Sequence, residues 1–197
     1  MKDTKGQLGS YLNRSMNFGT GEVDLMFSKM TKRTYAKKAV ILNQEEIATH
    51  RYFILEGLVR VFHTNEKGIE TINQFAIENW WVASVESFVE HTPSHYAIQA
   101  IEKTTVLSIA KADLEELYIS IPKLERFFRK ITERMLMAII RKNEVFMKYP
   151  SYERYRFFVD SVPGFAQRVP QYMIASYLDI SPEYLSEIRN NSDPMIS

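Results

Sequence analysis

A cluster of small, polar and aromatic side chains near the end of the chain has the chemistry of a hydrogen-bonding surface. Ser181, Pro182 and Glu183 form a typical helix start, with a capping serine, a proline at the first helical position and an acid near the positive end of the helix. The hydroxyls, carboxylates and phenol that follow can donate or accept hydrogen bonds. The candidate surface consists of Arg168, Gln171, Tyr172, Ser181, Pro182, Glu183, Tyr184, Ser186, Glu187 and Arg189.

Two short helices must position this surface. Residues 171–178 predict the first helix, Asp179 and Ile180 predict a tight turn, and the second helix begins after Ser181. Two short helices joined by such a turn form a helix-turn-helix, whose second helix enters the major groove of DNA in many proteins. The alanine-sized and apolar positions that this motif needs are filled by Ala175, Leu178, Ile180, Leu185 and Ile188.

The local charge leaves an alternative open. Between residues 141 and 191, seven Lys and Arg face six Asp and Glu, so this segment has almost no net positive charge. A single copy with this charge should bind DNA poorly, because phosphate neutralisation supplies much of the affinity. Two copies on adjacent major grooves would be required. The alternative is a helical hairpin without a DNA role.

A second candidate surface lies in residues 78–96. Trp80 and Trp81 are followed by Val85 and Phe88 at helical spacing, so a short helix is predicted between two strands. An insertion of this kind predicts either a small-molecule pocket or aromatic side chains that close the open end of a barrel. The candidate effector pocket consists of Glu78, Asn79, Trp80, Trp81, Ser94 and His95.

Between residues 35 and 109 the chain has the pattern of an antiparallel β-structure. Short runs rich in Val, Ile, Phe, Tyr and Thr are separated by turn signals. Gly57 predicts a tight turn inside the longest run, and Gly68 predicts a hairpin turn. These strands favour a small barrel or sandwich. The predicted strands are 39–42, 52–55, 58–62, 69–75, 95–101 and 105–110. Residues 31–38 are predicted to be a connection, and residues 1–21 a flexible arm with room for one short helix.

Residues 122–148 predict one long helix with two apolar faces. It has no glycine, and its only proline is at the first position, where a helix tolerates it. Two apolar faces are too many for a surface helix that packs on one core, so we expect one face to bind a second copy of the chain. The alternative is an ordinary buried helix. The a/d-spaced stripe predicted as the dimer interface is Leu124, Phe128, Ile131, Met135, Ala138, Lys142 and Val145.

Composition excludes several classes of protein. The chain has 197 residues, a net charge of +1 and no cysteine, which excludes disulfides, zinc–thiolate sites, iron–sulfur clusters and cysteine nucleophiles. No apolar run is long enough to cross a membrane, and the start of the chain has no signal core, so a cytoplasmic location is expected. No Ser/His/Asp arrangement, metal-ligand spacing or phosphate loop is visible. We therefore predict no catalytic or metal-binding residues and no enzymatic activity.

The order of β-structure with an embedded helix, long helix and helix-turn-helix resembles the CRP/FNR (catabolite-activator) superfamily of transcription regulators. YFILEGLVRVF (52–62) resembles the strand–glycine–strand signature of its cyclic-nucleotide-binding domain, and RVPQYMIASYLDISPEYLSEIR (168–189) resembles its helix-turn-helix. The resemblance implies an α+β fold with an antiparallel β-roll of the jelly-roll type. It also implies a β-roll sensor domain at 22–121, a long dimer helix at 122–149 and a winged-helix-like DNA-binding domain at 150–197.

The candidate pocket departs from the family pattern. Cyclic-AMP binders of this superfamily offer a Gly-Glu pair to the ribose and an Arg-Ser pair to the phosphate. Here the first pair falls near Ile77-Glu78 and the second near Ser94-His95, so the arginine is missing. Cyclic AMP is therefore not expected as the effector, and no cofactor is predicted. Four scattered histidines do not favour a haem site.

The sequence thus predicts a homodimeric regulator that binds double-stranded DNA. RNA polymerase and a small-molecule effector of unknown identity are the further partners that the resemblance implies. The alternative function is a small-molecule-binding or protein-interaction module with a degenerate helix-turn-helix. The near-neutral charge of residues 141–191 favours that alternative.

Overall fold

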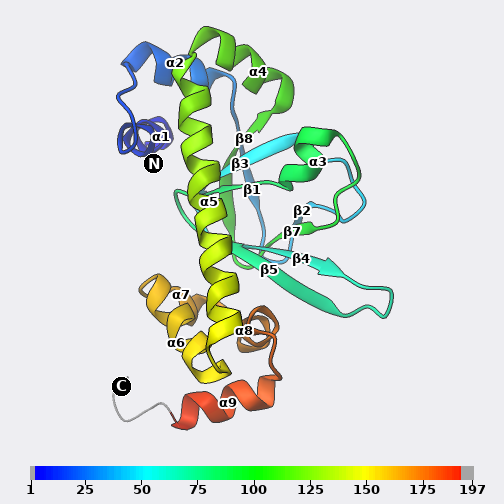
Figure 1. Cartoon of the computed structure of the whole chain (residues 1–197). Helices are drawn as coiled ribbons and strands as arrows, with labels where there is room; N and C mark the ends of the chain where they lie inside the picture. Colours follow the sequence, from blue (N-terminus) through cyan, green and yellow to red (C-terminus); the bar gives the residue numbers. More distant parts are fainter. Residues whose placement is uncertain (1–2, 192–197) are drawn as a thin grey trace.

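The computed structural model describes residues 3–191, and Figure 1 shows a β-roll beside one long helix, with shorter helices at both of its ends. Residues 1–2 of the predicted arm and 192–197 of the predicted C-terminal domain lie outside the described residues. The helices are α1 (Thr4–Asn13), α2 (Thr20–Ser28), α3 (Val85–Glu90), α4 (Lys111–Ser120), α5 (Lys123–Lys148), α6 (Ser151–Ser161), α7 (Phe165–Arg168), α8 (Gln171–Leu178) and α9 (Pro182–Asn191).

Two antiparallel sheets of four strands each make up the β-roll. One sheet has the order β1-β8-β3-β6 and the other β2-β7-β4-β5. The strands are β1 (Thr31–Tyr35), β2 (Val40–Leu42), β3 (His50–Glu56), β4 (Val59–Thr64), β5 (Glu70–Ala76), β6 (Trp81–Val82), β7 (Ala97–Ala100) and β8 (Thr104–Ala110). The predicted α+β class and antiparallel roll are confirmed.

The predicted connection at 31–38 is wrong over its first five residues, which form β1. This edge strand pairs with β8 from Thr31 opposite Ser108 to Tyr35 opposite Thr104. Four of its five side chains are exposed, so it has no apolar alternation by which sequence could reveal it. The backbone of β8 supplies the pairing partner. The two-residue strand β6, at Trp81 and Val82, was missed because it lies inside a segment with helical spacing.

The predicted arm is not loose between Thr4 and Asn13, where the short helix that it had room for is the packed helix α1. Asp3 caps α1 by accepting a hydrogen bond from the Gly6 N–H at 3.0 Å, and the helix packs on the core through Leu8 and Leu12, which are both fully buried. Two apolar side chains in ten residues give little amphipathic signal. The helix is stabilised by tertiary packing, which the local sequence pattern does not reveal.

The first part of α5 packs on its own protein. Leu124 and Phe127 are fully buried, and Phe128 is nearly so. The ring of Phe127 meets Phe18 edge-on with centroids 5.7 Å apart, and the ring of Phe128 meets Trp81 at 5.0 Å. The predicted dimer interface is therefore wrong at Leu124 and Phe128, because both side chains are part of the core of one protomer.

The rest of the predicted stripe follows the same side of the helix. Ile131 packs against the core, and Met135, Lys142 and Val145 are half-buried, whereas Ala138 is exposed. The opposite side carries the larger apolar surface. We call it the exposed apolar face of α5, and it consists of Leu136, Met137, Ile139, Ile140 and Met147. The prediction of two apolar faces is confirmed, but the stripe assigned to a second copy lies on the side of α5 that packs on its own protomer.

Lys142 illustrates how the predicted stripe packs on its own protomer. Its ammonium donates a hydrogen bond to the Asn73 carbonyl at 3.1 Å and lies 3.9 Å from the centre of the Tyr177 ring. Burial lowers the pKa of Lys142 to about 8. In the sequence this lysine interrupts an apolar stripe, whereas in the structure its methylene groups and cation fit a junction between α5, β5 and α8.

The pKa of Lys142 predicts a pH-dependent stability. The charged form is disfavoured in the folded state, so the cost is complete below pH 8 and vanishes as the pH approaches the ordinary value of 10.5. We expect the stability of Lys142→Met relative to the wild type to fall by on the order of 2 kcal/mol as the pH rises through this window. Urea unfolding at several pH values measures the difference. A difference that is constant with pH would contradict the assignment.

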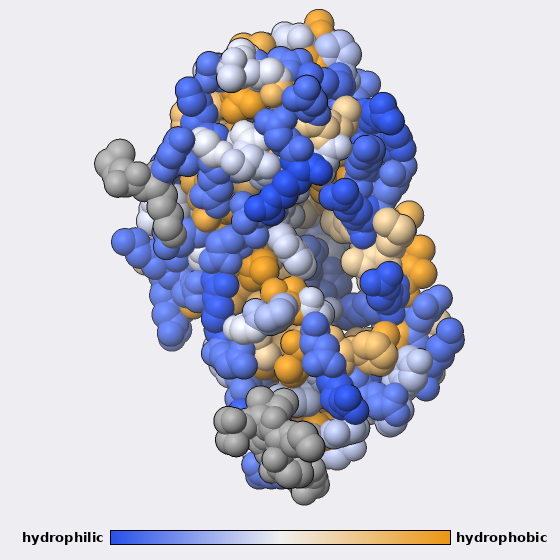
Figure 2. All heavy atoms as spheres, turned by 90° about the vertical axis from the view of Figure 1, so that its left-hand side faces the viewer, coloured by the Kyte–Doolittle hydropathy of each residue, from blue (hydrophilic) through white to orange (hydrophobic). Residues whose placement is uncertain are grey.

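The helices α6–α9, here called the C-terminal unit, pack on the β-roll mainly along β5. One apolar cluster contains Ile72 and Phe75 of β5 together with Phe158, Phe165 and other side chains of the unit. Figure 1 shows the unit beside the lower half of α5, with α9 farthest from the roll. Figure 2 shows that the molecule is hollowed at mid-height on the adjoining face, between the N-terminal and the C-terminal helices. Along residues 3–191, none of the helices combines the length and apolar character that crossing a membrane requires.

Candidate functional site

The helix pair α8–α9 has the geometry of a helix-turn-helix. Helix α8 ends at Asp179, which takes the left-handed conformation at φ +55°. The Ser181 hydroxyl accepts a hydrogen bond from the Tyr184 N–H at 3.1 Å, which confirms the predicted cap. Leu185 is fully buried and Ile188 nearly so, and both lie on the inner side of α9. The capped start and this buried side fix which face of α9 is turned outward.

The outward face of α9 carries most of the predicted hydrogen-bonding surface. Every predicted member on α9 is exposed, and so are the two predicted members at the start of α8. These exposed residues are Ser181, Pro182, Glu183, Tyr184, Ser186, Glu187 and Arg189, with Gln171 and Tyr172. The structure thus brings nine of the ten predicted residues to one end of the molecule, where Figure 1 shows α9 at the lower end.

Arg168 is the exception, and its predicted position on the open surface is wrong. Its guanidinium donates two hydrogen bonds to the Glu78 carboxylate, at 3.0 and 2.8 Å, and a third to Glu102 at 2.6 Å. Both acids belong to the β-roll, and about a third of each of the three side chains is exposed. The arginine therefore joins the C-terminal unit to the roll.

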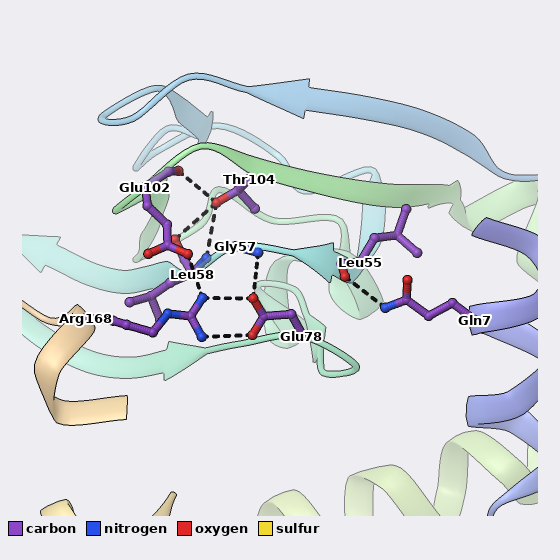
Figure 3. A network of polar contacts seen from close by, with 8 residues as sticks. All are labelled: Gln7, Leu55, Gly57, Leu58, Glu78, Glu102, Thr104 and Arg168. Atoms are coloured by element: carbon purple, nitrogen blue, oxygen red, sulfur yellow. Dashed lines mark hydrogen bonds and ion pairs between the residues drawn. The ribbon is translucent and has the colours of Figure 1, made fainter. Parts of the chain in front are cut away.

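Figure 3 shows that Arg168 belongs to a larger set of polar contacts, here called the junction network. The Glu78 carboxylate also accepts a hydrogen bond from the Gly57 N–H at 2.9 Å. The Thr104 hydroxyl donates to the carbonyls of Leu58 and Glu102, and it accepts from the Leu58 N–H. The network consists of Gln7, Leu55, Gly57, Leu58, Glu78, Glu102, Thr104 and Arg168.

The N-terminal helix reaches the same two turns. The Gln7 side-chain amide donates to the Leu55 carbonyl at 2.8 Å and to the Asn79 side-chain oxygen at 3.3 Å. Asn79 takes a left-handed conformation at φ +65°, which asparagine tolerates better than most residues. The turns at 55–58 and 78–79 therefore connect α1, the roll and the C-terminal unit.

Electrostatics favour the ionised carboxylate at Glu78. Burial opposes ionisation, but the guanidinium of Arg168 and the Gly57 N–H outweigh it, so the pKa of Glu78 lies below its usual value of 4.5. The two carboxylates raise the pKa of Arg168, which is charged in any case. The network therefore holds one cation between two anions.

The predicted effector pocket is wrong as a single site, because its six residues make separate contacts. Glu78 and Asn79 belong to the junction network, Trp80 and His95 are exposed, and Ser94 is buried elsewhere in the roll. The Trp81 ring packs between Phe53, at 5.4 Å, and Phe128, at 5.0 Å. Trp81 thus packs against the core.

Serine hydroxyls line the region around Ser94. Its hydroxyl donates to the Ser84 hydroxyl at 2.8 Å and lies 2.7 Å from the Tyr96 carbonyl. The Ser87 hydroxyl accepts from the Ala48 N–H and lies 2.5 Å from the Thr92 carbonyl. The sequence analysis missed Ser84 and Ser87, although their spacing of three on a short helix is a visible signal. Among the described residues, no three His, Asp or Glu side chains gather to hold a metal ion.

Comparison with known proteins gives a consistent picture of the fold. Residues 32–120 match the family model of the cyclic nucleotide-binding domain. FixK2 from Bradyrhizobium japonicum is similar in structure, with 22% identity, 82% of this chain and 83% of that chain covered, and a TM-score of 0.71. No curated protein matches the sequence.

Two further solved structures are similar over most of their length. The c-di-GMP responsive global regulator CLP of Xanthomonas campestris has 14% identity, 88% and 91% coverage of this chain and that chain, and a TM-score of 0.71. A CooA mutant from Carboxydothermus hydrogenoformans has 16% identity, 90% and 80% coverage, and a TM-score of 0.69. At these identities, the likeness establishes the fold. Residues 32–120 therefore match a cyclic nucleotide-binding domain, and the chain as a whole has the fold of these solved structures.

Proposed function

We propose that the protein is a homodimeric, DNA-binding transcription regulator of the CRP/FNR type. The observation that carries this proposal is the outward face of α9, where a capped helix presents polar side chains to solvent while Leu185 and Ile188 anchor it. The fold shared with known regulators supports the same function.

Two copies are needed because each has little positive charge near α9. The exposed apolar face of α5 supports pairing through this helix. Leu136, Ile140 and Met147 are separated by four and seven residues, so they follow one side of the helix. About half of the Leu136 and Ile140 side chains and three quarters of Met147 are exposed in one protomer. Burial of this face against its own copy would place two α9 helices in one particle, as binding to two half-sites requires.

The residues of α9 divide into two roles in this proposal. Glu183 is close to the start of the helix, where side chains reach base edges, and a carboxylate can accept a hydrogen bond from cytosine N4. Arg189, Gln171 and Tyr172 are exposed donors that suit phosphate contacts. The phosphate contacts set the register of the protein on DNA, and Glu183 contributes to sequence preference.

The experiment that tests the function uses duplexes selected by the wild-type protein from a random-sequence library. Glu183→Ala is expected to weaken binding to the selected duplex by about 10- to 100-fold, or about 1–3 kcal/mol, with the dimer intact. Its binding to unselected DNA should change little. Gel retardation at several salt concentrations measures both, and the wild-type affinity should fall steeply with salt.

Glu90→Ala provides the matched control, because Glu90 is an exposed acid on α3, far along the chain from the helix-turn-helix. Its affinity should equal that of the wild type. If the purified protein enriches no duplex and retards no DNA at low salt, the proposal fails. That outcome would favour the alternative of a binding module whose helix-turn-helix contacts another protein, in line with the near-neutral charge of residues 141–191.

The sensor role of the roll belongs to the proposal as well. Trp81 packs against Phe53 and Phe128, and the nearby hydroxyls of Ser84 and Ser94 bond to each other. In the sequence, no arginine stands next to Ser94, where cyclic-AMP binders of the superfamily offer one to the phosphate. We infer that an effector of the roll is not cyclic AMP. The regulator function also implies RNA polymerase as a further partner and a cytoplasmic location.

A further inference from the structure

We propose that Arg168 is an ionic latch, which holds the C-terminal unit in its docked position on the β-roll and, when broken, lets that unit move relative to the roll. The proposal goes beyond the function above, because it concerns the tertiary structure of the chain and holds whether or not the protein binds DNA. It starts from the three hydrogen bonds that connect Arg168 with Glu78 and Glu102, which lie 90 and 66 residues away in the sequence.

The geometry of the contact is that of a specific clamp. Both terminal nitrogens of the guanidinium meet both oxygens of Glu78, which is the bidentate arrangement that matches arginine to a carboxylate. The second of these nitrogens also reaches Glu102. A lysine ammonium cannot reproduce this fork, so the site is specific for a guanidinium. Figure 3 shows the guanidinium facing the Glu78 carboxylate, with its two bonds side by side.

The β-roll holds the acceptor side of the latch in place. The Gly57 N–H fixes the Glu78 carboxylate, and Gln7 of α1 fixes the adjacent residue Asn79. The Glu102 carbonyl accepts a hydrogen bond from the Thr104 hydroxyl at 2.9 Å. Because two carboxylates share one cation, the loss of Arg168 would leave two like charges at the same point. This acceptor site is therefore built for a cation.

The donor side is carried by a short helix with its own anchor. Helix α7 has four residues, and Phe165 and Ala166 are buried at its start. Gly164, at φ +74°, precedes it and follows Pro163, so the chain turns sharply between α6 and α7. Phe165 meets the Phe75 ring of β5 with centroids 5.5 Å apart. Arg168 is thus delivered to the roll one helical turn beyond an apolar contact.

Among the described residues, the other contacts between the unit and the roll are uncharged, and they include a buried apolar cluster in which Leu58, Ile72 and Phe75 of the roll meet side chains of the unit. The Ser176 hydroxyl of α8 accepts from the Ile72 N–H at 3.1 Å and donates to the Glu70 carbonyl at 3.2 Å. The other contact surface is the aromatic cluster around Phe75, with Phe158 and Tyr177. Figure 2 shows a hollow rather than continuous packing at this height on one face. Arg168 therefore supplies the charged contact of this junction, which makes docking sensitive to salt and to competing ions.

The position of Arg168 also connects the latch to α8. Only Val169 and Pro170 separate it from the first residue of α8. In the docked position, the cation is turned toward the roll and away from the exposed face that Gln171, Tyr172 and α9 present. Opening of the latch would release this cation and free α8 to leave the edge strand β5. A single ionic contact would thus set both the charge and the position of the helix pair.

The test uses the absence of cysteine from the natural chain. Cysteines introduced by Glu86→Cys on α3 and Asp160→Cys on α6 carry spin labels, because both positions are exposed and lie on helices of the roll and of the C-terminal unit. Pulsed electron paramagnetic resonance then measures their separation. The labelled protein is mixed with an excess of unlabelled protein, so that a dimer contains at most one labelled protomer, and the wild-type background should then give one narrow distance at low salt. Glu78→Gln with Glu102→Gln should add a second distance that holds a major share of the population.

The matched control is Glu66→Gln with Glu90→Gln, which removes two exposed acids of the same type from the roll. It should keep the single wild-type distance. Arg168→Gln should reproduce the effect of the Glu78 and Glu102 substitutions, and all three together should produce no further change. Circular dichroism verifies that each variant is folded. If the Glu78 and Glu102 variant retains the wild-type distance at both low and high salt while folded, the latch proposal is overturned.

DNA binding is measured separately on the same proteins. A change in distance without any DNA binding would support the latch and refute the regulator function. Normal DNA binding with an unchanged distance would support the regulator function and refute the latch.

Discussion

Replacement of Leu136 and Ile140 together by glutamate should convert the protein from a dimer to a monomer at micromolar concentration. In the proposed dimer these two side chains bury apolar surface against the partner helix, so the variant would force four uncompensated carboxylates into the interface. Each central apolar contact of an interface is worth about 2 kcal/mol or more, so we expect dimer affinity to fall by about 1,000-fold. Sedimentation velocity over a concentration series measures the change.

Ala138→Glu is the matched control for this prediction. Ala138 is exposed, but it lies on the opposite side of α5 and belongs to the stripe predicted from sequence as the interface. If the dimer forms through the exposed apolar face of α5, Ala138→Glu leaves the dimer intact. If Ala138→Glu dissociates the dimer and the Leu136 and Ile140 variant does not, the sequence-based interface is correct. A wild-type protein that is monomeric at micromolar concentration would remove the basis of the regulator proposal.

Gly57→Ala should destabilise the protein strongly, because neither the backbone conformation nor the space at this turn accepts a side chain. Gly57 has φ +108°, where residues with a side chain are strained. An added Cβ would lie 2.6 Å from the Thr104 Cα and 2.8 Å from the Lys103 carbonyl oxygen, and neither backbone atom can turn aside. Strain of about 1–3 kcal/mol and overpacking of about 1–3 kcal/mol should combine to about 3 kcal/mol or more. Urea unfolding measures the loss.

Gly68→Ala separates the two causes of that loss. Gly68 has φ +76° in the hairpin between β4 and β5, and an added Cβ there meets no atom within 4 Å. It carries the conformational strain without the clash, so a loss of about 1 kcal/mol is expected. If Gly57→Ala costs no more than Gly68→Ala, the β3–β4 turn can move away from Thr104. Gly57 would then not be a fixed point of the junction network.

Local patterns were sufficient for most of the elements. The runs of β-branched and aromatic residues place β2–β5, β7 and β8, because half-buried strands impose a composition on the residues themselves. The cap at Ser181 and the proline after it place α9, because capping is an interaction within four residues. The order of these elements was enough to indicate the fold.

The sequence therefore determined the architecture, the helix-turn-helix and the exposed face of α9. The tertiary structure alone decided which side of α5 meets its own core, that α1 is a packed helix, and that Arg168 bonds to Glu78 and Glu102. Those outcomes depend on which residues from distant parts of the chain meet. Hydrophobic spacing within one helix is the same for both apolar faces, so it does not tell which face packs on the protein's own core. An arginine likewise has the same local pattern whether a phosphate or a carboxylate 90 residues away accepts its hydrogen bonds, because ion pairing depends on folded geometry rather than on neighbouring sequence.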